Sequence, residues 1–77
     1  MLKDIINIDP EIMSGTPVFM GTRVPVKYLF DYLETGETLE FFLEEFPTVN
    51  RKLAIELLAL AHQLVISKNA ADEKIAA

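Results

Sequence analysis

The sequence predicts a mainly helical domain, with three helices that follow an N-terminal arm of short strands. From Val26 onward, apolar residues recur at the three- and four-residue spacing of an amphipathic helix. Glycine and proline are instead concentrated over residues 10–25, where a continuous helix is implausible. We therefore expect an arm over residues 1–25, a tri-helical domain over 26–67 and a flexible tail over 68–77, all within a single domain.

The arm contains two stretches that favour strands. The run Ile5–Ile8 is rich in β-branched residues, and the apolar patch Val18–Met20 lies among the turn residues of Ser14–Pro25. Two short strands alone are marginal in water. The arm must therefore pack on the helices or pair with a second chain.

The first two helices have clear boundaries. The first runs over Val26–Thr35, because Pro25 suits a helix start and Gly36 suits a left-handed cap at its end. The second begins after Thr38, whose hydroxyl can cap the helix, and ends before Pro47, since the residue before a proline avoids the α region.

The third helix runs from Arg51 to about Ser67, with Asn50 as its N-cap. Its apolar face is wider than a single surface helix requires, which indicates a central helix or an oligomer seam. The predicted order along the chain is a short helix, a glycine-containing turn, a second short helix and then a longer one. This order matches the helix-turn-helix motif. The wide face comprises Ala54, Leu57, Leu58, Ala61, Leu64 and Val65.

The composition argues against an enzyme. There is no cysteine, no glycine-rich phosphate loop, and a single histidine, His62, for which we expect a packed or rim position. We expect no catalytic residue, no metal, no cofactor and no small-molecule substrate. The start of the chain does not resemble a signal peptide, and the longest apolar run, Leu57–Ala61, is far too short for a membrane span. A soluble, cytoplasmic protein with no membrane partner is the expectation.

The charge is unevenly distributed. The net charge is −5, which argues against non-specific nucleic-acid binding. Six acidic residues and no basic ones lie between Tyr28 and Val49. Two basic pairs flank this block, and a fold could bring them to one side. These pairs are Arg23 with Lys27 and Arg51 with Lys52.

Arg51 and Lys52 place two cations in the first turn of a helix, where they oppose the helix dipole. An unfavourable charge placement that brings no evident gain in stability suggests a function. In a helix-turn-helix protein, the start of the recognition helix is the part that contacts DNA. Alternatively, the two cations balance Glu44 and Glu45 across the preceding turn. The DNA-binding candidates are Asn50, Arg51, Lys52, Arg23 and Lys27.

Arg23 has two interpretations of its own. Its guanidinium offers a planar fork to a phosphate or a carboxylate. Alternatively, it ties the arm to the helices by capping carbonyl groups or by pairing with an acid such as Asp9 or Glu34.

Apolar residues of the arm and of the first helix are candidates for an interface. The arm is apolar enough to fit strand pairing in a dimer. Tyr28 and Tyr32, four residues apart and off the main apolar face, either form an interface stripe or pack beneath the arm. The interface candidates are Met13, Val18, Phe19, Met20, Tyr28 and Tyr32.

Nearly the whole chain, from about Ile5 to His62, resembles the domain-of-unknown-function family 433. The family often has a further glycine where this chain has Ser14. The residues that carry the resemblance are Ile8-Asp9-Pro10, Ile12, Gly15-Thr16-Pro17-Val18, Gly21-Thr22-Arg23-Val24-Pro25-Val26, Leu33-Glu34-Thr35-Gly36 and Phe46-Pro47.

The resemblance implies a homeodomain-like, winged or tri-helical DNA-binding fold. It also implies an antitoxin of the VapB type, whose bacterial partner is a PIN-domain ribonuclease toxin. Fold alone does not establish function, so two hypotheses stand. One is a homodimeric antitoxin-like protein that binds its operator DNA and a nuclease toxin, the latter through apolar surface or the tail. The other is a protein-interaction or oligomerisation module that does not bind DNA.

Overall fold

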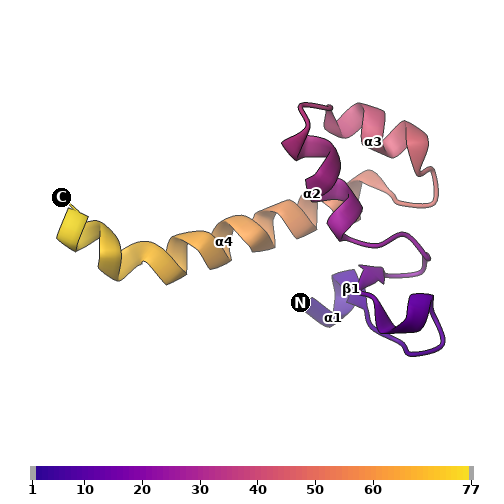
Figure 1. The fold of residues 1–77 in the computed structure, drawn as a ribbon, viewed down its shortest axis with the longest axis horizontal. Coiled ribbons are helices and arrows are strands. Elements are labelled where there is room, and N and C mark those ends of the chain that lie inside the picture. Colours follow the sequence, from indigo (N-terminus) through magenta and orange to yellow (C-terminus); the bar gives the residue numbers. More distant parts are fainter. Residues whose placement is uncertain (1, 77) are drawn as a thin grey trace.

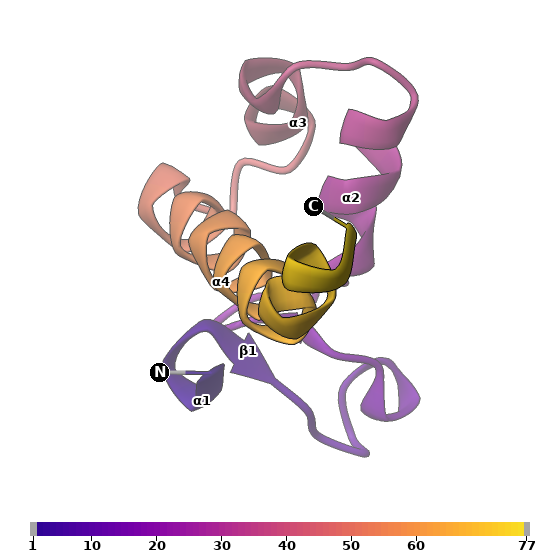
Figure 2. The same ribbon diagram turned by 90° about the vertical axis from the view of Figure 1, so that its left-hand side faces the viewer.

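The computed structural model describes the backbone of residues 2–76 and the side chains of residues 4–67. The N-terminal half of the longest helix lies between the α2–α3 pair on one side and the N-terminal arm on the other (Figures 1 and 2). The fold is mainly helical with a short two-stranded sheet, as predicted. Its elements are α1 (Leu2–Ile5), β1 (Ile6–Asn7), the 3-10 turn η1 (Met13–Gly15), β2 (Val18–Phe19), α2 (Lys27–Glu34), α3 (Leu39–Glu45) and α4 (Arg51–Ala76).

The arm folds onto the helices of its own chain. Strands β1 and β2 are antiparallel, with Ile6 opposite Phe19 and Asn7 opposite Val18. Val18 also forms a bridge to Pro25. Both β2 side chains are fully buried. Of the two arrangements that the sequence left open, packing on the helices is therefore the one that the chain adopts.

Helix α1 was not predicted, and the strand expected over Ile5–Ile8 covers only Ile6–Asn7. A helix this short is unstable in isolation, because nucleation costs more than one turn returns. Its last residue, Ile5, is buried in the core, and α1 contacts α4. Tertiary packing therefore stabilises α1, and local sequence signals do not reveal it.

Helix α2 ends in the left-handed cap that Gly36 predicts. Gly36 has a φ of +91°. Its N–H donates to the Leu33 carbonyl at 3.0 Å, and the Glu37 N–H donates to the Tyr32 carbonyl at 3.0 Å. This pair of bonds is the Schellman motif. It turns the chain within a few residues and brings α3 against α2.

The two predicted side-chain caps are both present. The Thr38 hydroxyl accepts a hydrogen bond from the Phe41 N–H at 3.0 Å, which fixes the start of α3. Asn50 Oδ1 accepts from the Leu53 N–H at 2.8 Å, which fixes the start of α4. Each cap satisfies an N–H that has no partner within its own helix.

Helix α4 continues to Ala76, well beyond the end near Ser67 that the sequence predicts. That prediction of the boundary is wrong. No glycine or proline follows Pro47, and good helix formers such as Ala70 and Ala71 lie in the last part of the chain. Nothing local stops the helix.

One hydrophobic core joins the arm to the helices. Buried side chains come from α1, β2, α2, α3, the α3–α4 connection and the first part of α4. The buried cluster consists of Ile5, Phe19, Leu29, Phe42, Val49, Ala54 and Leu57. The core contacts α4 only along its N-terminal half, and the C-terminal half projects away from the other elements (Figure 1).

Candidate interaction surfaces

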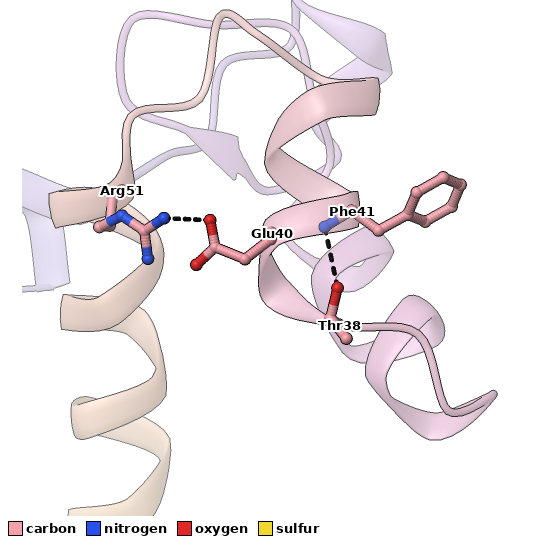
Figure 3. A network of polar contacts seen from close by, with 4 residues as sticks. All are labelled: Thr38, Glu40, Phe41 and Arg51. Atoms are coloured by element: carbon pink, nitrogen blue, oxygen red, sulfur yellow. Dashed lines mark hydrogen bonds and ion pairs between the residues drawn. The ribbon is translucent and has the colours of Figure 1, made fainter.

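The start of α4 is held by an ion pair as well as by its cap. The Arg51 guanidinium points at the carboxylate of Glu40, which lies in the first turn of α3 (Figure 3). Both side chains are exposed. In the alternative to DNA binding, we expected Arg51 to balance the charges of Glu44 and Glu45. In the structure, the ion-pair partner of Arg51 is Glu40.

The ion pair changes the acidity of both groups. The hydrogen bond from Arg51 and the charge of its guanidinium lower the pKa of Glu40 below its ordinary value of 4.5. In turn, the hydrogen bond to Glu40 and the carboxylate charge raise the pKa of Arg51. A cation in the first turn of a helix opposes the helix dipole. The Glu40 carboxylate offsets that repulsion at the point where α4 begins.

The four basic candidates fall into two classes. Lys27 Nζ lies 3.1 Å from Asp31 Oδ2 on the same face of α2, so its charge, like that of Arg51, is next to a carboxylate. Within the described part of the chain, Arg23 and Lys52 form no ion pair. The structure thus leaves Arg23 and Lys52 available to an anionic partner.

Arg23 follows a tight turn that its neighbour Thr22 fixes. The Thr22 hydroxyl donates to the Phe19 carbonyl at 2.9 Å and accepts from the Val24 N–H at 3.0 Å. The φ of Gly21 is +78°, a conformation that favours glycine at this position of a turn. Arg23 does not pair with Asp9 or Glu34, so the interpretation that it ties down the arm by an ion pair is wrong.

An open cavity of about 580 Å³ lies beside this turn. Its wall combines the arm, the turn and the connection between α3 and α4. These segments are far apart in the sequence, and the fold brings them together. The lining residues are Asn7, Ile12, Gly21, Thr22, Arg23, Val24 and Thr48.

The apolar candidates in the arm are largely core residues. Val18 and Phe19 have no exposed surface, so naming them as interface residues is corrected: they pack inside their own chain because the arm covers the helices. Met20 is half-buried, and its N–H donates to the Ile5 carbonyl at 2.8 Å. Met13 is 42% exposed and remains accessible to a partner.

Tyr32 packs against α3, and Tyr28 packs against Phe46, the residue that follows α3. The rings of Tyr28 and Phe46 are 5.7 Å apart, and Tyr32 lies 5.4 Å from Phe42 and 5.6 Å from Phe46. The tight turn at Gly36 explains these contacts, since it folds α3 onto this side of α2. Tyr32 belongs to the periphery of the core, whereas Tyr28 is 36% exposed.

Among the helix residues with described side chains, the most exposed apolar ones lie on α4. Leu64 and Val65 belong to the wide stripe that sequence reasoning assigned to one face, yet they are 61% and 58% exposed. Ile66 and Ile55, at 50% and 46%, were not singled out. The stripe runs past the end of the core, so only its first part is covered. The signal in the sequence was the excessive width of that stripe.

Among the residues with described side chains, no group of three or more metal-binding residues occurs, and His62 is exposed rather than packed. Within the same residues, no helix is sufficiently long and apolar to span a membrane.

The chain is similar to one protein of known structure and to one relative in sequence. The crystal structure of a DUF433 member protein from Anabaena variabilis is similar over 100% of this chain and 73% of that one, with a TM-score of 0.62 and 26% sequence identity. The uncharacterized protein y4eO of Sinorhizobium fredii is 38% identical over 48 residues. That match covers 62% of this chain but spans only 22% of the relative's length.

The family model agrees with the fold and with the residues that suggested the resemblance. It matches residues 6–61, which include both strands, helices α2 and α3 and the N-terminal half of α4. The chain belongs to the DUF433 family, described as a protein of unknown function.

Proposed function

We propose that this protein is a partner-binding module that docks on another protein through the C-terminal half of α4. The observation that carries the proposal is the exposure of Leu64 and Val65, which continue the apolar face of α4 beyond the end of the core, with Ile66 exposed beside them. A soluble protein usually leaves apolar residues exposed singly, whereas a grouped set marks an interaction site.

The shape of α4 supports this function. A helix that leaves the core gains no stability from its own domain, and isolated helical segments are marginal in water. Docking of an apolar helix in a groove of a partner is a recurring mode of recognition. Leu64 continues the spacing of the buried residue Leu57, at i+7, so the face that packs on the core in one half is presented outward in the other.

The partner we propose is a nuclease toxin of the PIN type, which makes the protein an antitoxin-like component of a two-protein pair. Support for this partner comes from the family resemblance, and the apolar stretch supplies the docking surface. The alternative without DNA binding, a protein-interaction module, uses the same surface.

The experiment is co-purification with the product of the neighbouring gene, followed by titration calorimetry with Leu64→Glu. The variant should weaken binding at least tenfold, because a carboxylate buried in an apolar groove costs far more than one hydrogen bond returns. Ile55→Glu is the matched control: it makes the same change on the same helix, at 46% exposure but beside the core. Equal binding by wild type and Leu64→Glu would refute the proposal.

DNA binding is the second candidate, favoured by the two cations that form no ion pair among the described residues, Lys52 and Arg23. Lys52 lies in the first turn of α4, where a recognition helix contacts DNA, and Arg23 is exposed. Two features weigh against it. First, Arg51 forms an ion pair with Glu40. Second, α3 carries three carboxylates, those of Glu40, Glu44 and Glu45, and these repel the phosphates of DNA. These features are the reason for ranking protein binding first.

An electrophoretic shift with the DNA upstream of the gene tests this candidate, alone and with the neighbouring gene product. Binding should weaken with added salt, since each phosphate contact releases counterions. Lys52→Ala should weaken it further, while Lys27→Ala, whose charge pairs with Asp31, should not. As a homodimer the protein would need two α4 starts about 34 Å apart. Absence of any shift at low salt excludes this function.

A further inference from the structure

The cavity beside the Gly21–Arg23 turn lies on a different part of the molecule from the exposed end of α4. We propose that it binds a small anion through a phosphate or carboxylate group, with Arg23 as the main ligand. The site is independent of the function proposed for α4.

Electrostatics point to an anion. Four lysines and arginines have described side chains, and two of them, Arg23 and Lys52, form no ion pair among the described residues. Lys27 and Arg51 each have a carboxylate partner, Asp31 and Glu40. Arg23 has none among the described residues, and no acidic residue lines the cavity. An anion entering here meets one positive charge and no lining carboxylate.

Three polar side chains in the wall, those of Arg23, Asn7 and Thr48, can donate hydrogen bonds to a ligand, whereas the Thr22 hydroxyl already donates to the Phe19 carbonyl. The guanidinium of Arg23 has a planar fork that fits two oxygens of a phosphate or carboxylate. The amide of Asn7, from β1, and the hydroxyl of Thr48, from the α3–α4 connection, are further donors. Three segments thus supply donors to one cavity, as a specific site requires.

The turn that carries Arg23 is held firmly before any ligand arrives. Besides the two bonds of the Thr22 hydroxyl, the Phe19 N–H donates to the Val24 carbonyl at 2.9 Å and the Thr22 N–H donates to the Phe19 carbonyl at 3.0 Å. Phe19 is itself fully buried. A backbone fixed in this way costs little ordering on binding. The cavity volume of about 580 Å³ is also within the range of about 300–1,000 Å³ typical of small-molecule sites.

The test is a titration of the isotope-labelled protein followed by amide NMR, with inorganic phosphate in one arm and acetate in the other. Resonances of Gly21, Thr22 and Thr48 should shift in at least one arm and saturate. Shifts with phosphate alone, acetate alone or both support the site and identify its chemistry. No saturable shift in either arm overturns it.

Two variants show whether Arg23 is the ligand. Arg23→Gln should weaken the binding at least tenfold, because the variant loses the charge-assisted hydrogen bonds of the guanidinium fork. Lys52→Gln is the matched control, since it removes an equal charge from an exposed position outside the cavity with no ion pair to any described residue, and should change the affinity less than about twofold. Equal losses in both variants would mean that net charge alone attracts the anion, and would refute the site.

Arg23→Gln should fold normally, because the Arg23 side chain is exposed and has no ion-pair partner among the described residues. An unchanged thermal unfolding midpoint checks this. Arg23→Lys keeps the charge without the planar fork. It should recover part of the affinity, and full loss in that variant would still support recognition by the fork.

Discussion

Arg51 and Glu40 form an ion pair that joins the first turn of α4 to the first turn of α3. The pair places a carboxylate next to a cation that the dipole of α4 would otherwise repel. The pair also engages the Arg51 guanidinium, which a recognition helix would direct at DNA. The same contact that stabilises the α3–α4 junction therefore weakens the case for DNA binding.

Acid should weaken this junction. Arg51 holds the pKa of Glu40 below 4.5, so the folded state binds fewer protons than the unfolded state in acid. The contribution of the pair to stability is fully present above the ordinary pKa of the carboxyl and is lost as the pH falls through the lower, folded value. Glu40→Gln should therefore make the unfolding midpoint less dependent on pH between about 6 and 3.

Thermal unfolding at a series of pH values measures this effect, which should be small because both groups are exposed. Glu44→Gln is the control: it removes a carboxylate from the same helix that forms no ion pair among the described residues. The prediction is contradicted if the two variants lose the same amount of pH dependence.

Phe42→Ala should destabilise the fold far more than Phe41→Ala. Phe42 is fully buried and contacts the rings of Phe19, Tyr32 and Phe46. Phe41 is 39% exposed and contacts Tyr32. Replacing a buried phenylalanine by alanine costs about 3–5 kcal/mol, whereas loss of one exposed ring contact costs about 1 kcal/mol. Chemical denaturation of both variants measures the difference in their free energies of unfolding. Similar unfolding midpoints for the two variants would mean that Phe42 is not a core residue.

Gly36→Ala should cost about 1–2 kcal/mol, the penalty for a side chain in the left-handed region. The added methyl group would meet no atom within 4 Å, so the cost is conformational and not steric crowding by neighbours. Gly36→Asn should lose less stability than Gly36→Ala, because asparagine tolerates the left-handed conformation better than alanine does. Urea denaturation measures both variants, and an unchanged midpoint for alanine would mean that the Schellman cap does not form.

Ser14→Gly should stabilise the arm. Ser14 has a φ of +56°, between Met13 at +51° and Gly15 at +86°, so a serine occupies a conformation that favours glycine. The gain should be up to about 1 kcal/mol, because the extra backbone entropy of an unfolded glycine offsets part of the strain.

Ser67→Gly is the matched control for this change. Ser67 lies inside α4, where glycine lowers stability by about 1 kcal/mol. The two substitutions should therefore shift the thermal midpoint in opposite directions. A lower midpoint for Ser14→Gly would show that the serine is not strained.

The capped ends of α2, α3 and α4 show what the sequence by itself determined. The caps at Thr38, Asn50 and Gly36 form as predicted, because each depends on a side chain or a φ angle and on N–H groups a few residues away. The period of the apolar residues likewise predicts three helices, since it reports one face of each.

Only the tertiary structure decided which surfaces remain for a partner. Glu40 and Arg51 are 11 positions apart, and their pairing depends on how α3 and α4 meet. The burial of Phe19 and the exposure of Leu64 have the same origin: both are apolar, and the reach of the core determines which of them is covered. Local signals act over about one turn of chain, whereas burial is a property of the packed whole.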